Sequence, residues 1–408
     1  MRSFRLQPFQ SNLCRLLSIG ILLLFCAGCE KKSVQRLTID NEATSTTSAR
    51  TYPCTVLLVG NDWLKEPLQR QWSARQDSDF EIQTESVEAF AAADFEIRQG
   101  VDVVIYPANL MIELIHRGRI VKLNKSVYQS ESFNKDDVLT HFRKSGIRYD
   151  SETWAVPCGG SMFSLLYQPE ALSTTQSQLP ETWSQLIRWG ERLNEKNDDS
   201  NNADSSQGIA VPLAEGWAAK SFITIAASYA RKKGRLSVLF ERRTMKPLIT
   251  SEAFVRGLEE LKSLAKLNPQ SLQWTPQDIF ENLVQGKLSA GVTWPRNSLP
   301  ADIDETAAQN LLVHSLPGSS TYFDESSDSW GTRQANESSV VNLHGINNLL
   351  ASQTKISRRP QSAVAFLKWL PESTISQTLF ASNPNLGPFR VTHLGDAQTW
   401  IGDQFSSK

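Results

Sequence analysis

The side chains that most often carry catalysis show no catalytic spacing in this chain. Gly159-Gly160-Ser161-Met162 lacks the closing glycine of the G-x-S-x-G nucleophile elbow. Acidic pairs such as Asp136-Asp137 and Glu259-Glu260 lie in polar or helical contexts typical of solvated faces. The five histidines have no HxxxH or HExxH spacing: His116, His141, His314, His344 and His393. We therefore expect no enzyme, no metal and no cofactor, although a carboxylate pair brought together by folding, as in a glycosidase, stays open.

The stretch from Trp154 to Leu172, WAVPCGGSMFSLLYQPEAL, is an apolar run interrupted at Pro157 to Ser161. Glycine permits backbone angles and close approaches that side chains forbid. N–H groups exposed at such a break can hydrogen-bond a ligand directly. Gly159, Gly160 and Ser161 are therefore candidate ligand contacts. The alternative reading, from these residues alone, is an ordinary tight turn in a hairpin.

The elements that must position such residues alternate between strand and helix patterns. In the first half, short buried strands are predicted at 54–60, 80–84 and 101–106, with helices at 64–75, 90–98 and 108–117. Later segments repeat the pattern, with helices at 216–230, 252–267, 276–284 and 360–370, strands at 287–294 and 340–351, and polar loops at 194–207 and 319–339. This alternation indicates an α/β protein with parallel strands.

Polar and aromatic side chains come after several of these strands. Loops after the carboxyl ends of strands are where α/β lobes place ligand contacts. The chain has eleven tryptophans, and indole offers a large rigid surface for stacking. The candidates are Asn61, Asp62 and Trp63 after the first strand, Tyr106 and Asn109 after the third, Glu215 and Trp217 before a helix, and Trp294, Arg296 and Asn297 after a later strand. For each aromatic residue taken singly, the alternative is a core or rim position.

The N-terminus has the pattern of an export signal. Arg2, Arg5 and Arg15 precede an apolar run at 16–28, which is too short to span a bilayer because a span needs about 20 residues. Phe25 to Cys29 resembles a bacterial lipobox, in which the cysteine is acylated, although Cys26 stands where leucine is usual. We expect Cys29 to carry lipid; the alternative is a plain secretory signal. Residues 30–51 are polar and lack periodicity, which predicts a flexible tether.

Only Cys54 and Cys158 remain in the body of the chain. A disulfide between them would be permitted in an oxidising compartment, but Cys54 opens the first strand and Cys158 lies in the glycine-rich break, so we do not expect one. The formal net charge of −1 provides no global field for binding nucleic acid.

Several segments, in order, resemble family 1 extracellular solute-binding proteins of ABC importers, the maltose and multi-sugar type. The segment Glu152 to Leu172, which includes the stretch quoted above, is similar to a family segment with Val-Pro, a glycine-rich break and a strand ending in Tyr. Other similar segments are Pro180 to Leu186 (PETWSQL), Phe280 to Trp294, Leu312 to Gly318 (LVHSLPG), Leu343 to Leu370 and Asn385 to Arg390 (NLGPFR). The chain departs from the family pattern at Cys158, where Tyr is usual, and at His344-Gly345, where Gly-Gly is usual.

The resemblance implies a two-lobed periplasmic binding protein of type II-like fold, with hinge-connected lobes and mixed sheets flanked by helices. It implies a signal peptide at 1–28, a lipidated cysteine and tether at 29–52, an N-terminal lobe at 53–163 plus 344–375 and a C-terminal lobe at 164–343 plus 376–408. The break at Gly159-Gly160 would then be a hinge crossing. Gly345 and Arg390 become further candidate ligand contacts on this resemblance alone.

The function that the resemblance implies is capture of a small solute, most of all a sugar or oligosaccharide, and its delivery to ABC permease subunits. The protein would be an exported, membrane-anchored lipoprotein facing the periplasm or cell exterior, and we expect a monomer. Two alternatives stay open. One is a surface lipoprotein with a sensing or other non-transport role. The other is a binder of a different solute, such as a metal, a polyamine or an amino acid.

Overall fold

The computed structural model describes residues 52–75, 79–140, 142–160, 162–199, 207–231, 237–241, 244–294, 311–334, 348–381 and 386–395. Within these ranges the strands form two larger sheets, each with its own hydrophobic core. The expected signal segment, Cys29 and most of the tether lie outside the described residues.

The first lobe is built on a mixed sheet in the order β2-β1-β3-β13-β6. Its strands are β1 (Cys54–Val59), β2 (Phe80–Glu85), β3 (Val103–Pro107), β6 (Val156–Gly160) and β13 (Asn348–Gln353). β1 runs parallel to β2 and β3, whereas β13 is antiparallel to β3 and β6. Every residue of β1 is buried. An unbroken apolar run is what a strand covered on both faces requires, and this explains the sequence CTVLLV.

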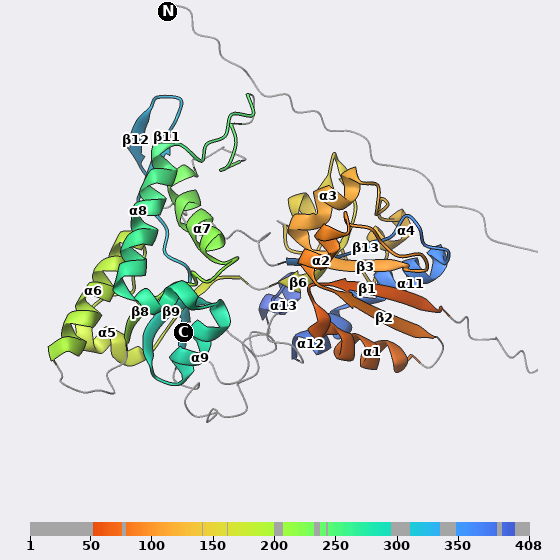
Figure 1. The fold of residues 1–408 in the computed structure, drawn as a ribbon, viewed down its shortest axis with the longest axis horizontal. Helices are drawn as coiled ribbons and strands as arrows, with labels where there is room; N and C mark the ends of the chain where they lie inside the picture. Colours follow the sequence, from red (N-terminus) through yellow and green to blue (C-terminus); the bar gives the residue numbers. More distant parts are fainter. Residues whose placement is uncertain are drawn as a thin grey trace, which may run out of the picture. The chain divides into compact units, whose positions relative to one another are not determined.

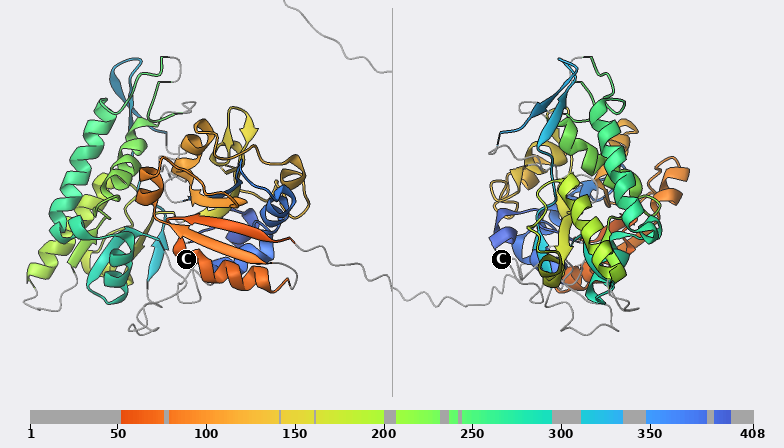
Figure 2. Two further views of the ribbon diagram at one scale, coloured as in Figure 1. Left: turned by 45° about the vertical axis from the view of Figure 1, so that its right-hand side comes forward. Right: turned by 90° about the vertical axis from the view of Figure 1, so that its left-hand side faces the viewer.

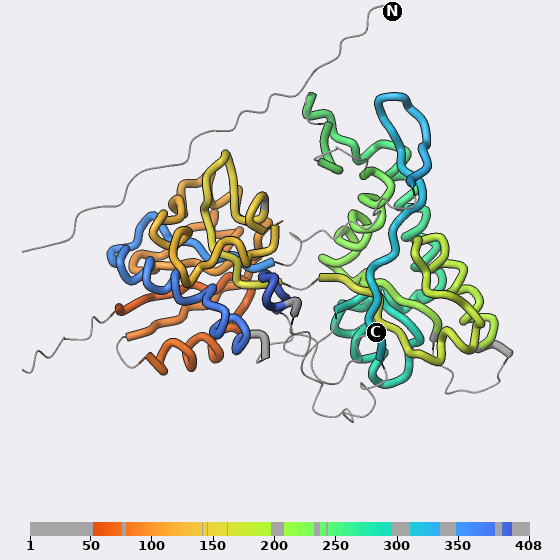
Figure 3. Tube along the Cα trace, turned by 180° about the vertical axis from the view of Figure 1, so that it is seen from behind, coloured from red at the N-terminus to blue at the C-terminus, as the bar shows by residue number. Residues whose placement is uncertain are grey.

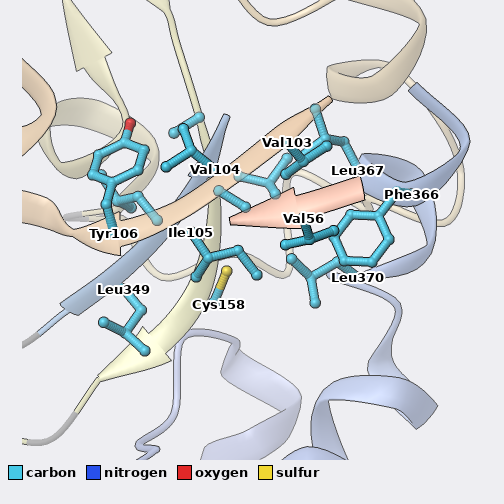
Figure 4. Close-up of a cluster of buried hydrophobic side chains, with 14 of the residues drawn as sticks. Val56, Val103, Val104, Ile105, Tyr106, Cys158, Leu349, Phe366, Leu367 and Leu370 are labelled. Carbon is cyan, nitrogen blue, oxygen red and sulfur yellow. The ribbon is translucent and has the colours of Figure 1, made fainter. Parts of the chain in front are cut away.

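Helices and short turns cover this sheet (Figure 1, red to orange, and blue). They are η1 (Asp62–Leu64), α1 (Lys65–Ser73), α2 (Val87–Ala92), η2 (Ala108–Leu110), α3 (Met111–His116), α4 (Lys125–Tyr128), a π turn (Phe142–Gly146), α11 (Pro360–Trp369), α12 (Ser373–Ala381) and α13 (Val391–Gly395), with a small hairpin of β4 (Arg148–Tyr149) and β5 (Glu152–Thr153). Phe366 and Leu370 lie beside Val56 in the core (Figure 4). Trp72 meets Trp369 edge to face at a centroid distance of 4.9 Å, so aromatic contacts join the first and last parts of this lobe.

The second lobe has a sheet in the order β10-β7-β9-β8. Its strands are β7 (Ser164–Tyr167), β8 (Gln207–Ala210), β9 (Leu288–Thr293) and β10 (Leu312–His314). Its helices are α5 (Pro169–Thr175), α6 (Trp183–Asp199), α7 (Ala218–Ala230), α8 (Glu252–Leu267), η4 (Pro269–Gln273) and α9 (Pro276–Val284). α7 and α8 lie side by side (Figure 2), and a Cβ added at Gly257 would be 2.6 Å from the Cα of Ala226. Glycine at this position therefore allows the two helices to approach closely.

Four sequence-based expectations are corrected here. The predicted loop at 319–339 contains a hairpin of β11 (Thr321–Asp324) and β12 (Ser329–Thr332), which is visible as a light blue loop in Figure 3. The expected interruption at Pro157 to Ser161 does not end the strand, because β6 continues through Pro157 and both glycines to Gly160. Because β6 and β7 belong to different sheets, the tight-turn hairpin reading of this stretch is wrong.

The fourth correction concerns the end of the chain. Residues 376–408 were expected in the C-terminal lobe, but Leu379, Leu386 and Phe389 are buried in the core of the first lobe. The backbone N–H of Leu139 donates to the Phe389 carbonyl at 2.9 Å, which fixes this return segment to the same lobe. The physical reason is its apolar composition, because these side chains fill the first core beside α12.

Candidate functional site

The sheet of the first lobe gathers several predicted residues along one edge. β1 and β3 are parallel, with Leu58 opposite Ile105, so the residues that come after them leave the sheet on the same side. The first residues of β13 and the last of β6 meet there too, because Asn348 pairs with Gly160. This edge therefore collects Asn61, Asp62 and Trp63 with Asn109, Gly159 and Gly160.

The side chains on this edge differ in what they can offer a ligand. Asn61 is buried, and its amide donates to the Val59 carbonyl at 2.6 Å, so it serves the turn after β1. Asp62 and Asn109 are exposed. Trp63 is half-buried and packs on the first core. Asp62, Trp63 and Asn109 thus combine polar groups with an aromatic face, a combination that suits a polar ligand with an apolar side.

Gly159 and Gly160 are buried within β6. Gly159 has φ +112°, which side chains rarely adopt, and the pairing register with β13 shifts beside it between Leu349 and Leu350. This combination is a β-bulge, which bends a strand and redirects the chain after it. The Gly160 N–H donates to the Gly387 carbonyl at 3.4 Å, so this group is already used inside the lobe. We therefore assign the glycines a backbone role at the exit of the sheet rather than direct ligand contact.

The second lobe presents an aromatic cluster at an edge of its own sheet. Ser164 at the start of β7 pairs with Thr293 at the end of β9, so Phe163 and Trp294 are neighbours. Their rings are stacked, with centroids 5.9 Å apart and planes at 27°. Trp217, just before α7, lies 5.5 Å from Trp294 and 6.0 Å from Phe163. We call Phe163, Trp217 and Trp294 the aromatic cluster.

The three rings of the aromatic cluster differ in how far they are exposed to solvent. Trp294 is only 8% exposed, whereas Phe163 and Trp217 are half-buried. Trp294 therefore backs the cluster, and the other two rings can stack on a ligand. Trp217 and Trp294 were predicted from the sequence, but Phe163 was missed. The sequence could have indicated Phe163, because it comes shortly after the glycine-rich break and directly before a buried strand.

Lys220 is a second residue that the sequence-based prediction missed. Its Nζ lies 3.9 Å from the centroid of the Trp217 ring, a cation–π geometry. Burial lowers the pKa of Lys220 below its ordinary value. Its spacing of three residues from Trp217, across the start of a helix, could have indicated this contact.

Tyr106 and Arg390 are corrected as candidate ligand contacts. Tyr106 is fully buried, its hydroxyl is 2.8 Å from the Ser352 hydroxyl, and burial raises the pKa of its phenol. Arg390 is 1% exposed and donates to the Phe133 carbonyl at 2.9 Å and to Asp137 at 3.2 Å. Each side chain thus satisfies internal polar groups of the first lobe and has no surface to offer. The sequence could not separate these roles, because aromatic and arginine residues serve both.

Glu215 is exposed, and the remaining predicted residues lie outside the described part of the chain: Ser161, Arg296, Asn297, Gly345 and Cys29. Within the described part, no three His, Cys, Asp or Glu side chains are grouped as metal ligands. The same residues include no helix with the length and apolarity to cross a bilayer. Cys54 and Cys158 are buried free thiols whose pKa values are raised by burial, so no disulfide joins them in this structure.

A separate hollow of about 600 Å³ lies in the second lobe between the β11–β12 hairpin and a segment that comprises Glu241 and residues 244–252. It shares no lining residue with the aromatic cluster, and Phe323 is the only aromatic residue among the described residues that line it. Its lining is mainly carboxylates and hydroxyls, so it lacks the stacking faces that distinguish the aromatic cluster.

No protein-family model matches the sequence, and no curated protein matches it either. Solved structures do match. Maltose-bound T. maritima MalE3 has a TM-score of 0.62 at 16% identity, over 86% of this chain and 85% of that one. A solute-binding protein of Agrobacterium radiobacter K84 in complex with ribitol has a TM-score of 0.63 at 15% identity, over 88% and 84%. MalE of Xanthomonas citri has a TM-score of 0.60 at 14% identity, over 87% and 85%.

These likenesses establish the fold: the chain is a two-lobed α/β protein with the architecture of ABC solute-binding proteins. The resemblance of the sequence to the maltose and multi-sugar type is thus confirmed at the level of the fold. The matched structures extend over most of both chains, so the fold applies to both sheets and not to one lobe alone.

Proposed function

We propose that this protein is an extracytoplasmic solute-binding lipoprotein that captures a sugar or polyol and delivers it to an ABC permease. In this proposal Cys29 carries the lipid anchor, the polar tether lets a monomeric body reach the permease, and no catalytic step occurs. Two of the matched proteins named above hold maltose and ribitol in their structures. Ligand binding would stabilise the closed arrangement of the lobes, which a permease could recognise.

The single observation that carries the proposal is the aromatic cluster. Pyranose rings have apolar faces that stack on aromatic side chains, while their hydroxyls bond polar groups. Phe163 and Trp217 provide such faces, and Asp62 and Asn109 provide exposed polar groups on the first lobe.

Connectivity also supports a shared site. β6 ends at Gly160 and β7 begins at Ser164, so a link of four peptide steps joins the two sheet edges. An extended chain advances at most about 3.6 Å per residue, which keeps these two points within about 14 Å of each other. The edge that bears Asp62 and Asn109 is therefore tethered closely to the edge that bears the aromatic cluster.

A thermal-shift screen of the full-length chain tests the proposal. The panel contains maltose, maltotriose, ribitol, mannitol and galactose, together with amino acids, polyamines and divalent metals. A ligand that binds the folded state adds RT ln(1 + [L]/Kd) to the free energy of unfolding, and the Tm rises as a result. We expect shifts with saccharides or polyols and none with the other classes. A shift with an amino acid, a polyamine or a metal alone would overturn the sugar assignment.

Two further measurements test the cellular role. Metabolic labelling with a fatty-acid analogue should mark the wild-type chain and leave Cys29→Ser unlabelled. Labelling of both chains would contradict the assignment of the lipid anchor to Cys29. Uptake of the bound sugar should fall in cells that lack the protein. Binding with unchanged uptake would favour the sensing alternative over transport.

A further inference from the structure

The chain enters the first lobe at one edge of its sheet. Tyr52, the first described residue, comes shortly before β1, and β1, β3 and β13 lie side by side (Figure 1). Val56 of β1 is opposite Val103 of β3, and Val103 is opposite Gln353 of the antiparallel β13. The start of β1, the start of β3 and the end of β13 therefore share one edge. We call the loops 94–102, 117–122 and 354–359 at this edge the entry edge.

The entry edge is rich in cations. Its loops contain seven arginine or lysine residues and three acidic residues, in a chain whose formal net charge is −1. Two of the three acids are used inside the lobe, because Asp94 pairs with Arg117 and Asp102 pairs with Arg359. The third acid, Glu96, is exposed. The loops of the entry edge therefore have more positive charge than their own acidic residues balance.

Three of these cations are exposed and have no ion-pair partner among the described residues: Arg98, Lys355 and Arg358. The loops that carry them are held together by hydrogen bonds. The Lys355 N–H donates to the Arg119 carbonyl at 2.9 Å, and the Arg358 guanidinium donates to the Gln99 side-chain oxygen at 2.8 Å. The three cations thus belong to one fixed surface, where they are available to a partner outside the chain.

We propose that the entry edge docks on the anionic surface of the membrane that holds the lipid anchor. This inference rests on the proposed function, because it requires the anchor at Cys29. Residues 30–51 connect that cysteine to Tyr52 and, at no more than about 3.6 Å per residue, keep the entry edge within about 80 Å of the bilayer. A tethered surface meets its target at a high effective concentration, so weak contacts are sufficient.

The chemistry of the entry edge matches that of phospholipid headgroups. Anionic headgroups attract lysine and arginine side chains near the bilayer surface. Ile356 lies between Lys355 and Arg358 in the chain and is 39% exposed, so it can enter the apolar boundary beneath the headgroups. Asp79 is an exposed acid before β2, but three strand spacings, about 14 Å, separate β2 from β13. At that distance salt screens its repulsion of the lipid.

Docking by the entry edge leaves the solute-binding edge of the first lobe free. β1 extends from Cys54 to Val59, which is about 17 Å along the strand. Asp62 comes after β1, and Glu85 ends the parallel strand β2, so both acids lie at the opposite edge. Anionic lipid would attract the entry edge and repel these two carboxylates. The charge pattern therefore favours one orientation, with the polar groups assigned to the solute facing away from the membrane.

An environment-sensitive fluorophore on Ile356→Cys tests the inference in the lipidated protein, reconstituted in vesicles. Cys54 and Cys158 are buried thiols and Cys29 would carry lipid, so the label should attach at position 356. On phosphatidylcholine vesicles that contain phosphatidylglycerol, emission should be about twofold or more above that on phosphatidylcholine alone, because the dye enters a less polar interface. The anchor is present on both kinds of vesicle, so the difference reports docking. Raising NaCl from about 50 to about 500 mM should remove it.

Charge reversal on the labelled protein tests the cations themselves. Lys355→Glu/Arg358→Glu should abolish the difference between the two kinds of vesicle. Lys262→Glu/Lys266→Glu, at exposed positions of α8, is the matched control, because it changes the net charge equally and should keep the difference. A fluorophore placed instead on Lys262→Cys should give equal emission on both kinds of vesicle.

The outcomes separate this inference from the proposed function. Equal emission at position 356 on both kinds of vesicle overturns membrane docking and leaves a protein partner for the entry edge, while the anchor and the sugar receptor stand. A difference that persists at high salt, or that survives Lys355→Glu/Arg358→Glu in a protein with wild-type Tm, also overturns it. If Cys29→Ser still takes the fatty-acid label, the proposed anchor fails and docking from it fails too, a result that the labelling experiment shows separately.

Discussion

The Arg359 guanidinium and the Asp102 carboxylate form an ion pair at 2.8 Å, with the aspartate fully buried and the arginine 36% exposed on its side chain. Asp102 also accepts the Thr55 N–H at 3.0 Å and the Ser357 hydroxyl at 2.7 Å. One carboxylate therefore joins β1 to the segment before α11, where Ser357 lies 255 residues beyond Asp102 along the chain.

Asp102→Asn should destabilise the protein by about 2 kcal/mol. Removing one partner of a buried pair leaves the other uncompensated, which costs about 3–5 kcal/mol when both are buried, and the exposure of Arg359 reduces that figure. Urea unfolding of both proteins measures the change. Asp94→Asn is the matched control, because Asp94 also pairs with arginine but is 69% exposed on its side chain. It should cost below about 1 kcal/mol, and equal losses in the two variants would contradict the argument.

Gly257→Ala should loosen the contact between α7 and α8. A Cβ at this position would lie 2.6 Å from the Ala226 Cα and 2.7 Å from its Cβ, both too close for van der Waals contact. The helices must separate to admit it, which typically costs about 1–3 kcal/mol, even though alanine favours helix more than glycine does. A thermal melt should show a lower Tm. Lys262→Ala, exposed on the same helix, is the control and should change stability by about 0.5 kcal/mol or less. A Tm of Gly257→Ala equal to that of the wild type would contradict the argument, because the helices would then admit the Cβ without loss of stability.

Gly159→Ala tests the β-bulge at the exit of the first sheet. At φ +112° an alanine is strained, so we expect a loss of about 1–3 kcal/mol. Gly100→Ala is a matched control, because Gly100 has φ +93° and open space around it. Both variants should lose stability, but only Gly159→Ala should weaken saccharide binding, because it alone alters the strand that leads to Phe163. Equal saccharide affinity in the two variants would show that the bulge at Gly159 does not affect binding.

His393 provides a pH-dependent prediction. It is 1% exposed, and burial together with the nearby Arg390 lowers its pKa to about 4, below the ordinary 6.5. Between pH 6.5 and 4 the unfolded chain binds a proton that the folded protein does not, so stability falls as the pH falls through this window. The loss is complete below about pH 4 and amounts to about 3 kcal/mol at most.

His393→Gln should remove this component. Urea unfolding from pH 4 to 7 should therefore give a shallower dependence for His393→Gln than for the wild type, whereas His116→Gln, at an exposed site, should keep the wild-type slope. Identical slopes for all three proteins would mean that His393 is protonated equally in the folded and unfolded states.

Much of the fold could be predicted because its signals are local. The continuous apolar runs of β1 and β3 and the stripe of α11 are visible as patterns in the sequence. The β11–β12 hairpin could not be predicted in this way, because polar residues surround Phe323 and Trp330 and hide their pairing. Leu379, Leu386 and Phe389 return to the first core from the end of the chain, and no local pattern encodes such a long-range contact.

The sequence predicted those residues of the candidate site that lie next to a strand end or a helix start. Trp217 and Trp294 could be identified from their places beside a helix start and a strand end. Tyr106 occupies an equivalent place but points into the core and bonds Ser352, a difference that only the sheet partner reveals. Lys220 was missed because the prediction followed strand ends, whereas its contact with the Trp217 ring comes from their spacing of three residues at the start of α7.

Trp217→Ala should weaken saccharide binding about ten- to a hundredfold while leaving the fold intact. Loss of a half-exposed ring removes stacking area from the ligand and the surface over which Lys220 lies, and truncating an aromatic contact at the centre of an interface typically costs about 2 kcal/mol or more. Trp330→Ala is the matched control, because Trp330 is 44% exposed and packs edge to face on Phe323 in the hairpin of the same lobe. It should retain wild-type affinity in titrations with the saccharide identified by the thermal-shift screen. Equal loss in both variants would indicate a general effect on the second lobe, and no loss in Trp217→Ala would exclude the aromatic cluster as the sugar-binding surface.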